Sequence, residues 1–252
     1  MVKELSMLMV VMYHHINSDD LGLSNEMSLF RRHLAYIKDN FHCVLPGDPL
    51  SETTSNICLT FDDAYFDFYH YVFPLLKELK LRAMLGVPVK FIGEATTLAA
   101  EKRLALKHDE IYQGDNYKTH ASFCTYPELQ EMVDSGLVRI ASHSYTHSNL
   151  VEDAVDMEYE LGESKRVLEE RLNIKVDTFI IPFGRYNDAV LAAAKKHYQY
   201  TMRIGNGINR DFGGVKGLIY RVKGDRLRSP TSIFSLGKLF KYRYKTFIKS
   251  FA

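Results

Sequence analysis

Residues 57–63 read Ile-Cys-Leu-Thr-Phe-Asp-Asp, a short and mainly apolar run that ends on two adjacent carboxylates. A run of this kind, without regular polar alternation, predicts a strand buried on both faces, as in a parallel sheet covered by helices. Active sites in such folds gather at the carboxyl ends of the strands, which is where Asp62 and Asp63 would lie. We therefore expect an α/β fold with acidic chemistry at the end of this strand.

Similar apolar runs alternate with helix-like segments along the chain. The expected strands are Leu8–Tyr13, Ile57–Phe61, Ala83–Val87, Val138–Ala141, Thr178–Pro182, Tyr200–Ile204 and Leu218–Val222. The expected helices are Ser28–Asn40, Tyr65–Leu79, Tyr126–Ser135, Asp153–Leu172 and Asp188–His197. Thr125 and Glu128 form a capping box before the third helix, and Gly136 follows its end. Seven strands with intervening helices predict an incomplete or distorted β/α barrel, and a doubly wound open sheet is the alternative.

The composition is that of one globular α/β domain. The chain has 252 residues, and its formal net charge of +1 gives no sign of nucleic-acid binding. Its three cysteines, Cys43, Cys58 and Cys124, are far apart, which argues against a disulfide framework and suits a reducing compartment. The apolar run Leu5–Tyr13 is too short to span a membrane and lacks a signal-peptide cleavage site. We therefore expect a cytoplasmic protein.

Two segments differ from the rest of the chain. Residues 90–122 lack strong periodicity and are expected to form a loop insertion within the single domain. Residues 236–252 alternate basic with aromatic and aliphatic residues and contain no acid. Such a segment can lie on an anionic membrane surface, here at the inner face of the membrane. The alternative is a terminal helix that packs its apolar face on the barrel.

A second chemical cluster follows the fourth expected strand. Residues 142–147 read Ser-His-Ser-Tyr-Thr-His, and histidines four positions apart can share one face of a helical turn. Imidazole is a good ligand for zinc and neighbouring transition metals. The adjacent carboxylates Asp62 and Asp63 diverge, so one can bind a metal while the other acts as a general base. Two histidines and one aspartate would leave metal positions open for water and substrate, as in a catalytic site.

A third cluster closes the fifth expected strand. Residues 180–186 read Ile-Ile-Pro-Phe-Gly-Arg-Tyr, which joins an apolar strand end to a proline, an aromatic residue and a glycine. This pattern predicts a rigid exit from the strand into a loop, and such an exit could wall a pocket.

Together these clusters resemble the motifs of the polysaccharide deacetylases, the NodB-homology or carbohydrate esterase 4 group. Residues 60–63, Thr-Phe-Asp-Asp, look like the T-F-D-D motif, and residues 143–147 match H-[ST]-x-x-H, with Leu150 following. The resemblance runs from about residue 8 to about residue 225, nearest to the biofilm-polysaccharide branch. The other similar stretches are residues 12–14 (Met-Tyr-His), 181–184 (Ile-Pro-Phe-Gly), 205–209 and 220–222.

The resemblance implies a NodB-like, distorted (β/α)7 barrel, a divalent metal, most often Zn²⁺, and removal of an acyl group from an N-acylated sugar. Matched residue by residue, Asp63, His143 and His147 would ligate the metal, and Asp62 would be the general base. The substrate-binding residues implied by the matched motifs and their neighbours are Tyr13, Pro182, Phe183, Gly184, Arg185 and Tyr186.

The sequence departs from the family pattern in three places. The third-motif arginine, which usually orients the base, falls at Ile180, and Arg185 is the candidate replacement. The late Leu-x-His that carries the general acid is missing after Arg221, so we expect His14, in preference to His15, as the acid. The chain has no tryptophan, so an aromatic wall must come from Tyr or Phe. These departures indicate a substrate unlike long chitin or peptidoglycan chains.

The sequence thus predicts metal-dependent hydrolysis of an N-acyl group, acetyl or formyl, on an amino sugar. That sugar would belong to a cell-surface polysaccharide or to its nucleotide- or lipid-linked precursor. Two alternatives stay open: a catalytically inactive sugar-binding protein on the same fold, and a metal-dependent amidase that acts on a non-sugar amide. Retention of all four motif residues, Asp62, Asp63, His143 and His147, favours an enzyme.

Overall fold

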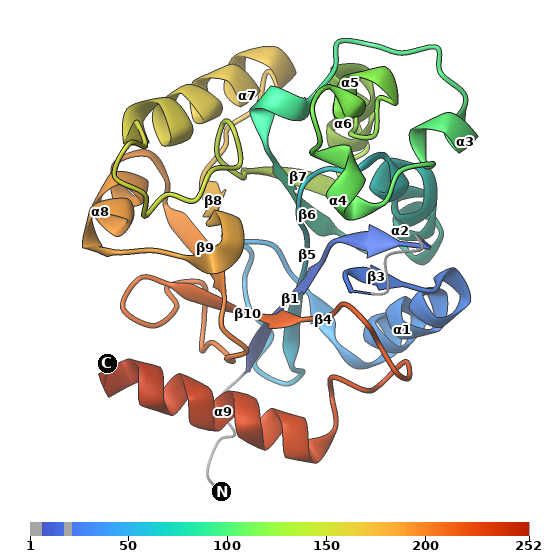
Figure 1. Cartoon of the computed structure of the whole chain (residues 1–252). Coiled ribbons are helices and arrows are strands. Elements are labelled where there is room, and N and C mark those ends of the chain that lie inside the picture. Colours follow the sequence, from blue (N-terminus) through green and yellow to red (C-terminus); the bar gives the residue numbers. More distant parts are fainter. Residues whose placement is uncertain (1–6, 18–21, 252) are drawn as a thin grey trace, which may run out of the picture.

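Seven parallel strands close into a barrel (Figure 1). This computed structural model describes residues 7–17 and 22–251, so the predicted start of the first apolar run at Leu5 and the last residue, Ala252, lie outside the described residues. Around the barrel the strands are β1 (Leu8–Tyr13), β5 (Asn56–Phe61), β6 (Ala83–Val87), β7 (Val138–Ser142), β8 (Thr178–Ile180), β9 (Tyr200–Ile204) and β10 (Ile219–Lys223). Because β1 pairs with both β5 and β10, the sheet closes. The (β/α)7 barrel is therefore confirmed, and the open sheet is wrong.

Three strands have the predicted bounds, and the other four differ from them by one or two residues. The main difference is β8, which ends at Ile180 because Pro182 has no N–H to donate and instead begins a 3₁₀ turn, η4 (Pro182–Gly184). Three two-residue strands complete the strand set of the described chain. These are β2 (His15–Ile16), β3 (Ser24–Asn25) and β4 (His42–Cys43).

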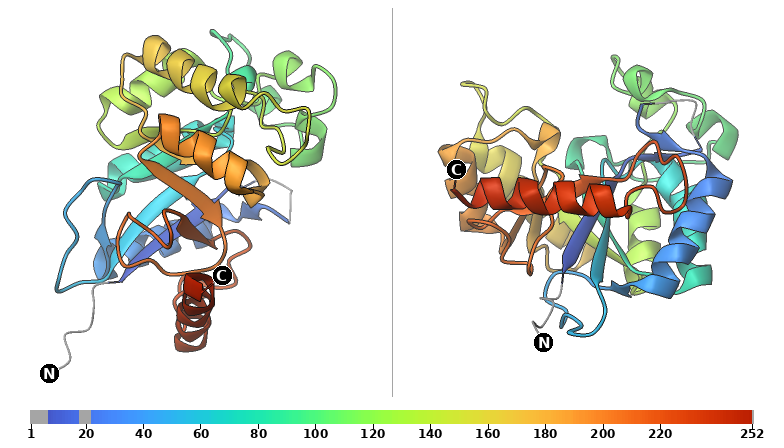
Figure 2. Two further views of the ribbon diagram at one scale, coloured as in Figure 1. Left: turned by 90° about the vertical axis from the view of Figure 1, so that its left-hand side faces the viewer. Right: turned by 90° about the horizontal axis from the view of Figure 1, so that it is seen from below.

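Helices cover the outside of the barrel (Figure 1). They are α1 (Met27–Asn40), the π-helical turn η1 (Phe68–Val72) continued by α2 (Phe73–Leu79), α6 (Tyr126–Asp134), the π-helical turn η3 (Glu158–Glu163) continued by α7 (Ser164–Leu172), and α8 (Asp188–His197). The capping box of Thr125 and Glu128 is present at the start of α6. No helix lies between β9 and β10 in the described chain, and α9 (Leu236–Phe251) packs along that side (Figure 2).

Residues 90–122 form short helical turns between β6 and α6. These are η2 (Val89–Phe91), α3 (Ala100–Arg103), α4 (His108–Ile111) and α5 (Asn116–Thr119). Arg103 ties this segment to α6, because its buried guanidinium forms a salt bridge with Glu128 and lies 3.5 Å from the Phe66 ring centroid. The same guanidinium donates to two backbone carbonyls, those of Ala121 and Phe123. The segment is thereby fixed against the barrel near the carboxyl ends of the strands.

Side-chain alternation along the strands separates two apolar clusters. On β1, Leu8 and Val10 belong to the cluster inside the barrel, whereas Met9 and Val11 pack toward the helices. Both faces are buried, which explains why the strands have no polar alternation in the sequence. On β5, the interior positions are Cys58 and Thr60, so that the next inward position, at the end of the strand, belongs to Asp62.

Candidate metal centre and catalytic site

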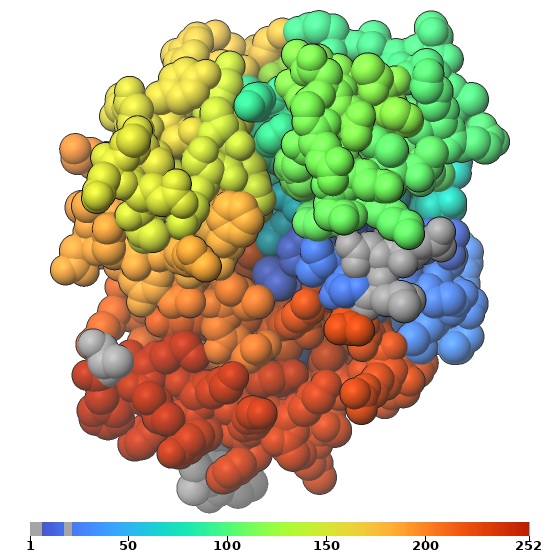
Figure 3. Space-filling view, viewed as in Figure 1, coloured from blue at the N-terminus to red at the C-terminus, as the bar shows by residue number. Residues whose placement is uncertain are grey.

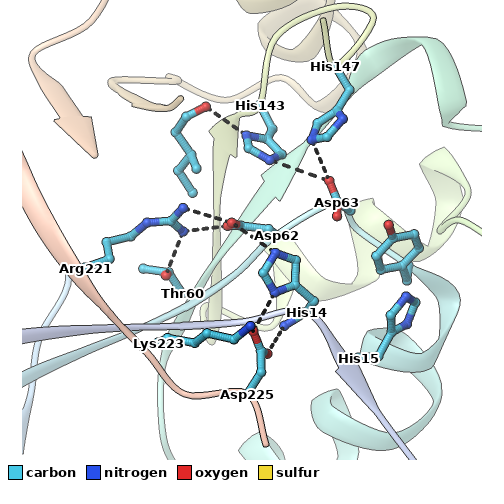
Figure 4. A network of polar contacts seen from close by, with 12 residues as sticks. His14, His15, Thr60, Asp62, Asp63, His143, His147, Arg221, Lys223 and Asp225 are labelled. Atoms are coloured by element: carbon cyan, nitrogen blue, oxygen red, sulfur yellow. Dashed lines mark hydrogen bonds and ion pairs between the residues drawn. The ribbon is translucent and has the colours of Figure 1, made fainter. Parts of the chain in front are cut away.

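The Asp63, His143 and His147 side chains converge beyond the carboxyl ends of β5 and β7 (Figure 4). The Nε2 atoms of His147 and His143 lie 3.1 Å and 3.5 Å from Asp63 Oδ1. One ligand atom from each residue falls within 4.8 Å of the others. Asp63 and His143 are buried, and His147 is nearly so. The geometry brings together the three residues expected to hold a metal.

The protonation states and free lone pairs of these three side chains suit a cation. The Nδ1 atom of His143 lies 2.8 Å from the carbonyl oxygen of Ile180, so Nδ1 donates and Nε2 presents a lone pair to Asp63. Burial lowers the pKa of His143 to about 4, which keeps the ring neutral. Within the described chain, Asp63 Oδ1 is buried without a hydrogen bond. Lone pairs that face one another in a buried site are satisfied by a positive ion, so the donor set suits a divalent metal.

The backbone is turned at several of these residues. Asp63 has φ of 71° and His147 has φ of 59°, both in the left-handed region that non-glycine residues rarely adopt. In an extended chain, Asp63 would point away from the barrel interior after Asp62 points inward. The left-handed turn at Asp63 brings the second carboxylate back toward the two histidines. Such strained conformations cluster at functional sites.

Asp62 is bound by an arginine from the opposite end of the sequence. Arg221 on β10 donates from Nη1 to Asp62 Oδ1 at 2.6 Å and from Nη2 to Oδ2 at 2.8 Å. Both side chains are buried, and Nη1 also lies 3.1 Å from Thr60 Oγ1. Burial opposes ionisation of Asp62, but the Arg221 guanidinium together with His143 and His14 holds the pKa of this carboxyl below its usual value. Asp62 is therefore held at the pocket as an ionised carboxylate.

The expected replacement for the missing family arginine was wrong. Arg185 is exposed and is not one of the described residues that line the pocket. Ile180 sits inside the barrel, and Arg221, also an inward position, supplies the guanidinium from β10 instead. An arginine in the middle of a predicted buried strand was the available signal, because a buried guanidinium needs an acidic partner.

His14 follows β1 and faces Asp62 across the pocket. Its Nδ1 lies 2.9 Å from Asp225 Oδ2, and its backbone N–H donates to Asp225 Oδ1 at 2.9 Å. Burial disfavours the charged ring, but the Asp225 carboxylate, with Asp62 and Asp63, raises the pKa of His14 to about 9. His14 Nε2 is 3.9 Å from Asp62 Oδ2. His15 lies outside this pocket, where it contacts Asp67 and stacks on a tyrosine.

These groups line a cavity of about 230 Å³. Figure 3 shows the corresponding face of the molecule hollowed at its centre. Phe183 and Gly184 line the cavity, and the exposed Phe183 ring lies 4.8 Å from the ring of His147. The remaining lining residues are Met12, His14, Leu23, Asp62, Asp63, His108, His143, His147, Ile181, Ile204, Arg221 and Lys223.

Three expected substrate-binding residues lie elsewhere. Tyr13 is fully buried in the core, where its hydroxyl is 2.7 Å from His33 Nε2, because the residue before His14 points to the opposite face of the strand. Pro182 is buried at the start of the η4 turn, and the Tyr186 ring packs against Arg203. None of the three is among the described residues that line the cavity.

Residues 90–122 contribute two aromatic rings that the motifs do not indicate. His108 lines the cavity, and Tyr112 lies parallel to His147, with their ring centroids 5.9 Å apart. Tyr65 connects the two through its hydroxyl, 2.9 Å from His108 Nδ1 and 2.8 Å from the Tyr112 hydroxyl. Only packing of residues 90–122 over the barrel rim reveals this wall of the site.

The polysaccharide deacetylase family profile matches residues 51–202, more than half of the chain, and the protein belongs to this family. The chain is 25% identical over 198 residues to YxkH of Bacillus subtilis (strain 168), covering 75% of this chain and 61% of that protein. It is 26% identical over 148 residues to the poly-beta-1,6-N-acetyl-D-glucosamine N-deacetylase of Escherichia coli (strain K12), covering 54% and 20%. The chain therefore spans less than two thirds of either relative.

Solved structures share the fold. A polysaccharide deacetylase from Bacillus cereus aligns with a TM-score of 0.72 at 22% identity, over 93% of this chain and 69% of that chain. The Streptococcus pyogenes deacetylase PplD, solved with acetate, aligns with a TM-score of 0.72 at 21% identity, over 90% and 96%. IcaB from Ammonifex degensii gives a TM-score of 0.68 at 18% identity, over 86% and 91%.

Proposed function

We propose that this protein hydrolyses the N-acetyl group of an amino sugar in a cell-surface polysaccharide or its nucleotide- or lipid-linked precursor. The observation that carries the proposal is the convergence of three side chains able to ligate a metal, those of Asp63, His143 and His147. They lie beside an ionised Asp62 and a protonated His14. The E. coli relative named as an N-acetylglucosamine polymer deacetylase supports N-acetyl as the group removed. Zn²⁺ suits the one-carboxylate, two-imidazole donor set.

A divalent cation at this site would polarise the acyl oxygen and lower the pKa of a water molecule. Asp62 would then take the proton of the attacking water, since its carboxylate is ionised and fixed by both Arg221 nitrogens. The water oxygen bonds to the acyl carbon and the carbon–nitrogen bond breaks. His14 would donate a proton to the leaving sugar nitrogen, since its pKa of about 9 keeps it charged near neutrality. The products are acetate and a free amino sugar.

The cavity size bears on the substrate. A volume of about 230 Å³ lies below the lower end of typical ligand sites, about 300 Å³. Such a cavity favours one sugar unit held with its acyl group inward. The exposed Phe183 beside His147 offers an apolar surface for a sugar ring or an acyl methyl group.

The test measures bound metal and released acetate on the same preparations. We expect Zn²⁺ to bind and acetate to be released from N-acetylglucosamine oligosaccharides or from UDP-N-acetylglucosamine. Asp62→Asn should keep the metal and lose about 10²- to 10⁴-fold in turnover, whereas His147→Ala should lose the metal. Exposed Arg185→Met is the matched control and should change neither. Metal binding without acetate release from any N-acetylated sugar would instead support a sugar-binding protein, and no metal binding would refute the proposed site.

A further inference from the structure

Most of the large hydrophobic side chains that are exposed in the described chain lie on one helix. The described chain exposes eight such side chains, and six of them belong to α9. Phe240 and Phe251 are each 74% exposed, although both are large aromatic residues. The six are Leu236, Phe240, Tyr244, Phe247, Ile248 and Phe251. Grouped exposure of this kind marks an interaction surface, unlike single exposed residues.

The helix packs on the barrel through its other face. Tyr242 is buried, and Thr246 Oγ1 pairs with both the N–H and the carbonyl of Ile208, each at 2.8 Å. Lys249 Nζ donates to the carbonyl of Gly205 at 2.8 Å. The sequence-based alternative, in which the apolar face packs on the barrel, holds only for Tyr242 and the partly buried Leu239. A narrow and partly polar face holds α9 in place, and the apolar face points outward.

Basic residues border the apolar face. At about 100° per residue, the six exposed side chains fall within an arc of roughly 120° centred opposite Tyr242. Arg243 lies at one edge of this arc and Lys241 at the other, with Lys245 and Lys238 beyond it. The helix contains no acidic residue. An apolar arc bordered by cations is the pattern of a helix that lies in a membrane interface.

We propose that α9 docks the protein side-on to an anionic lipid surface. Its aromatic side chains would enter the boundary between headgroups and acyl chains, and Lys241 and Arg243 would contact lipid phosphates. A second copy of the chain fits this face poorly, because a two-fold contact would bring the basic rows of two helices together without an acid to pair them.

The position of α9 leaves the catalytic pocket open. Figure 2 shows α9 across the side of the barrel, whereas the pocket lies at the carboxyl ends of the strands. A membrane against the outer face of α9 would therefore lie beside the pocket mouth without covering it. No helix of the described residues is long and apolar enough to cross a membrane, so α9 would lie along the surface.

Vesicle co-sedimentation of the whole chain tests the docking surface. We expect the protein to sediment with vesicles of equal parts phosphatidylcholine and phosphatidylglycerol, and far less with phosphatidylcholine alone. The double variant Phe240→Ser with Phe247→Ser should lower the partition by about tenfold or more. Replacing Lys241 and Arg243 by Gln should lower it by about fivefold for each charge removed, and added salt should weaken the wild type.

The matched control is Tyr159→Ser, which removes an exposed aromatic side chain away from α9 and should bind as the wild type does. Circular dichroism of each variant shows whether the fold is kept. Equal binding to neutral and anionic vesicles, or no binding to either, would overturn the proposal. So would a dimer in sedimentation velocity that disappears in the double phenylalanine variant, because the apolar face would then bind a second copy.

Discussion

Replacing Arg221 by methionine removes the one guanidinium that binds Asp62 in the described chain. Asp62 is 4% exposed, so the substitution leaves a buried carboxylate without its two short hydrogen bonds. Breaking a buried pair by removing one partner costs about 3–5 kcal/mol, a large share of a total stability of about 5–15 kcal/mol. We expect this loss in urea unfolding at neutral pH, and a smaller loss for Arg221→Lys, which keeps the charge without the paired geometry.

The same variant should change catalysis through the protonation of Asp62. Without Arg221, burial raises the pKa of Asp62, so that less of the carboxylate is ionised near neutrality. Acetate release should fall by about 10²- to 10⁴-fold and recover partly as pH rises. Arg185→Met is the control, because an exposed side chain should change stability by less than about 0.5 kcal/mol. If Arg221→Met kept wild-type stability and turnover, or Arg185→Met lost them, the assignment of Arg221 would be refuted.

Three further predictions follow from the same contacts. Asp225→Asn should lower the pKa of His14 from about 9 toward 6.5, so that turnover is lost at a lower alkaline pH than in the wild type. In the wild type, the stability that the His14–Asp225 pair contributes is complete below pH 6.5 and is lost as pH rises through about 9. The variant should not show that loss of stability. Zn²⁺ at about 100 times its Kd should stabilise the wild type by about 2.7 kcal/mol, and an unchanged thermal shift in His147→Ala would contradict the ligand set. Gly184→Ala should destabilise the protein by more than about 1 kcal/mol in urea unfolding, because Gly184 has φ of 65° and an added Cβ would collide with Ile204.

The ligands of the site and the residues that tune them differ in how far the sequence reveals them. The ligands could be predicted because they lie in two short motifs, and each motif directly follows a strand whose buried, apolar character is local. Period-two alternation along β5 also places Asp62 inward. The partners that tune these residues lie far away in the chain. Arg221 is 159 residues from Asp62, and Asp225 is 211 residues from His14. No local pattern connects them.

The family resemblance favoured the barrel over the open sheet, and the sequence pattern by itself determined the seven strands and the positions of Asp62, Asp63, His143 and His147. Pattern was enough there, because burial on both faces and strand-end placement depend on neighbouring residues. Only the tertiary structure decided which arginine forms a salt bridge with Asp62, which carboxylate raises the pKa of His14, and which face of α9 is exposed. Those outcomes depend on closure of β1 against β10 and on how residues 90–122 and α9 pack, which are contacts between distant segments. The sequence offers several arginines and two faces of one helix. Which arginine pairs with Asp62 and which helix face packs on the barrel is decided by shape and charge in the folded chain.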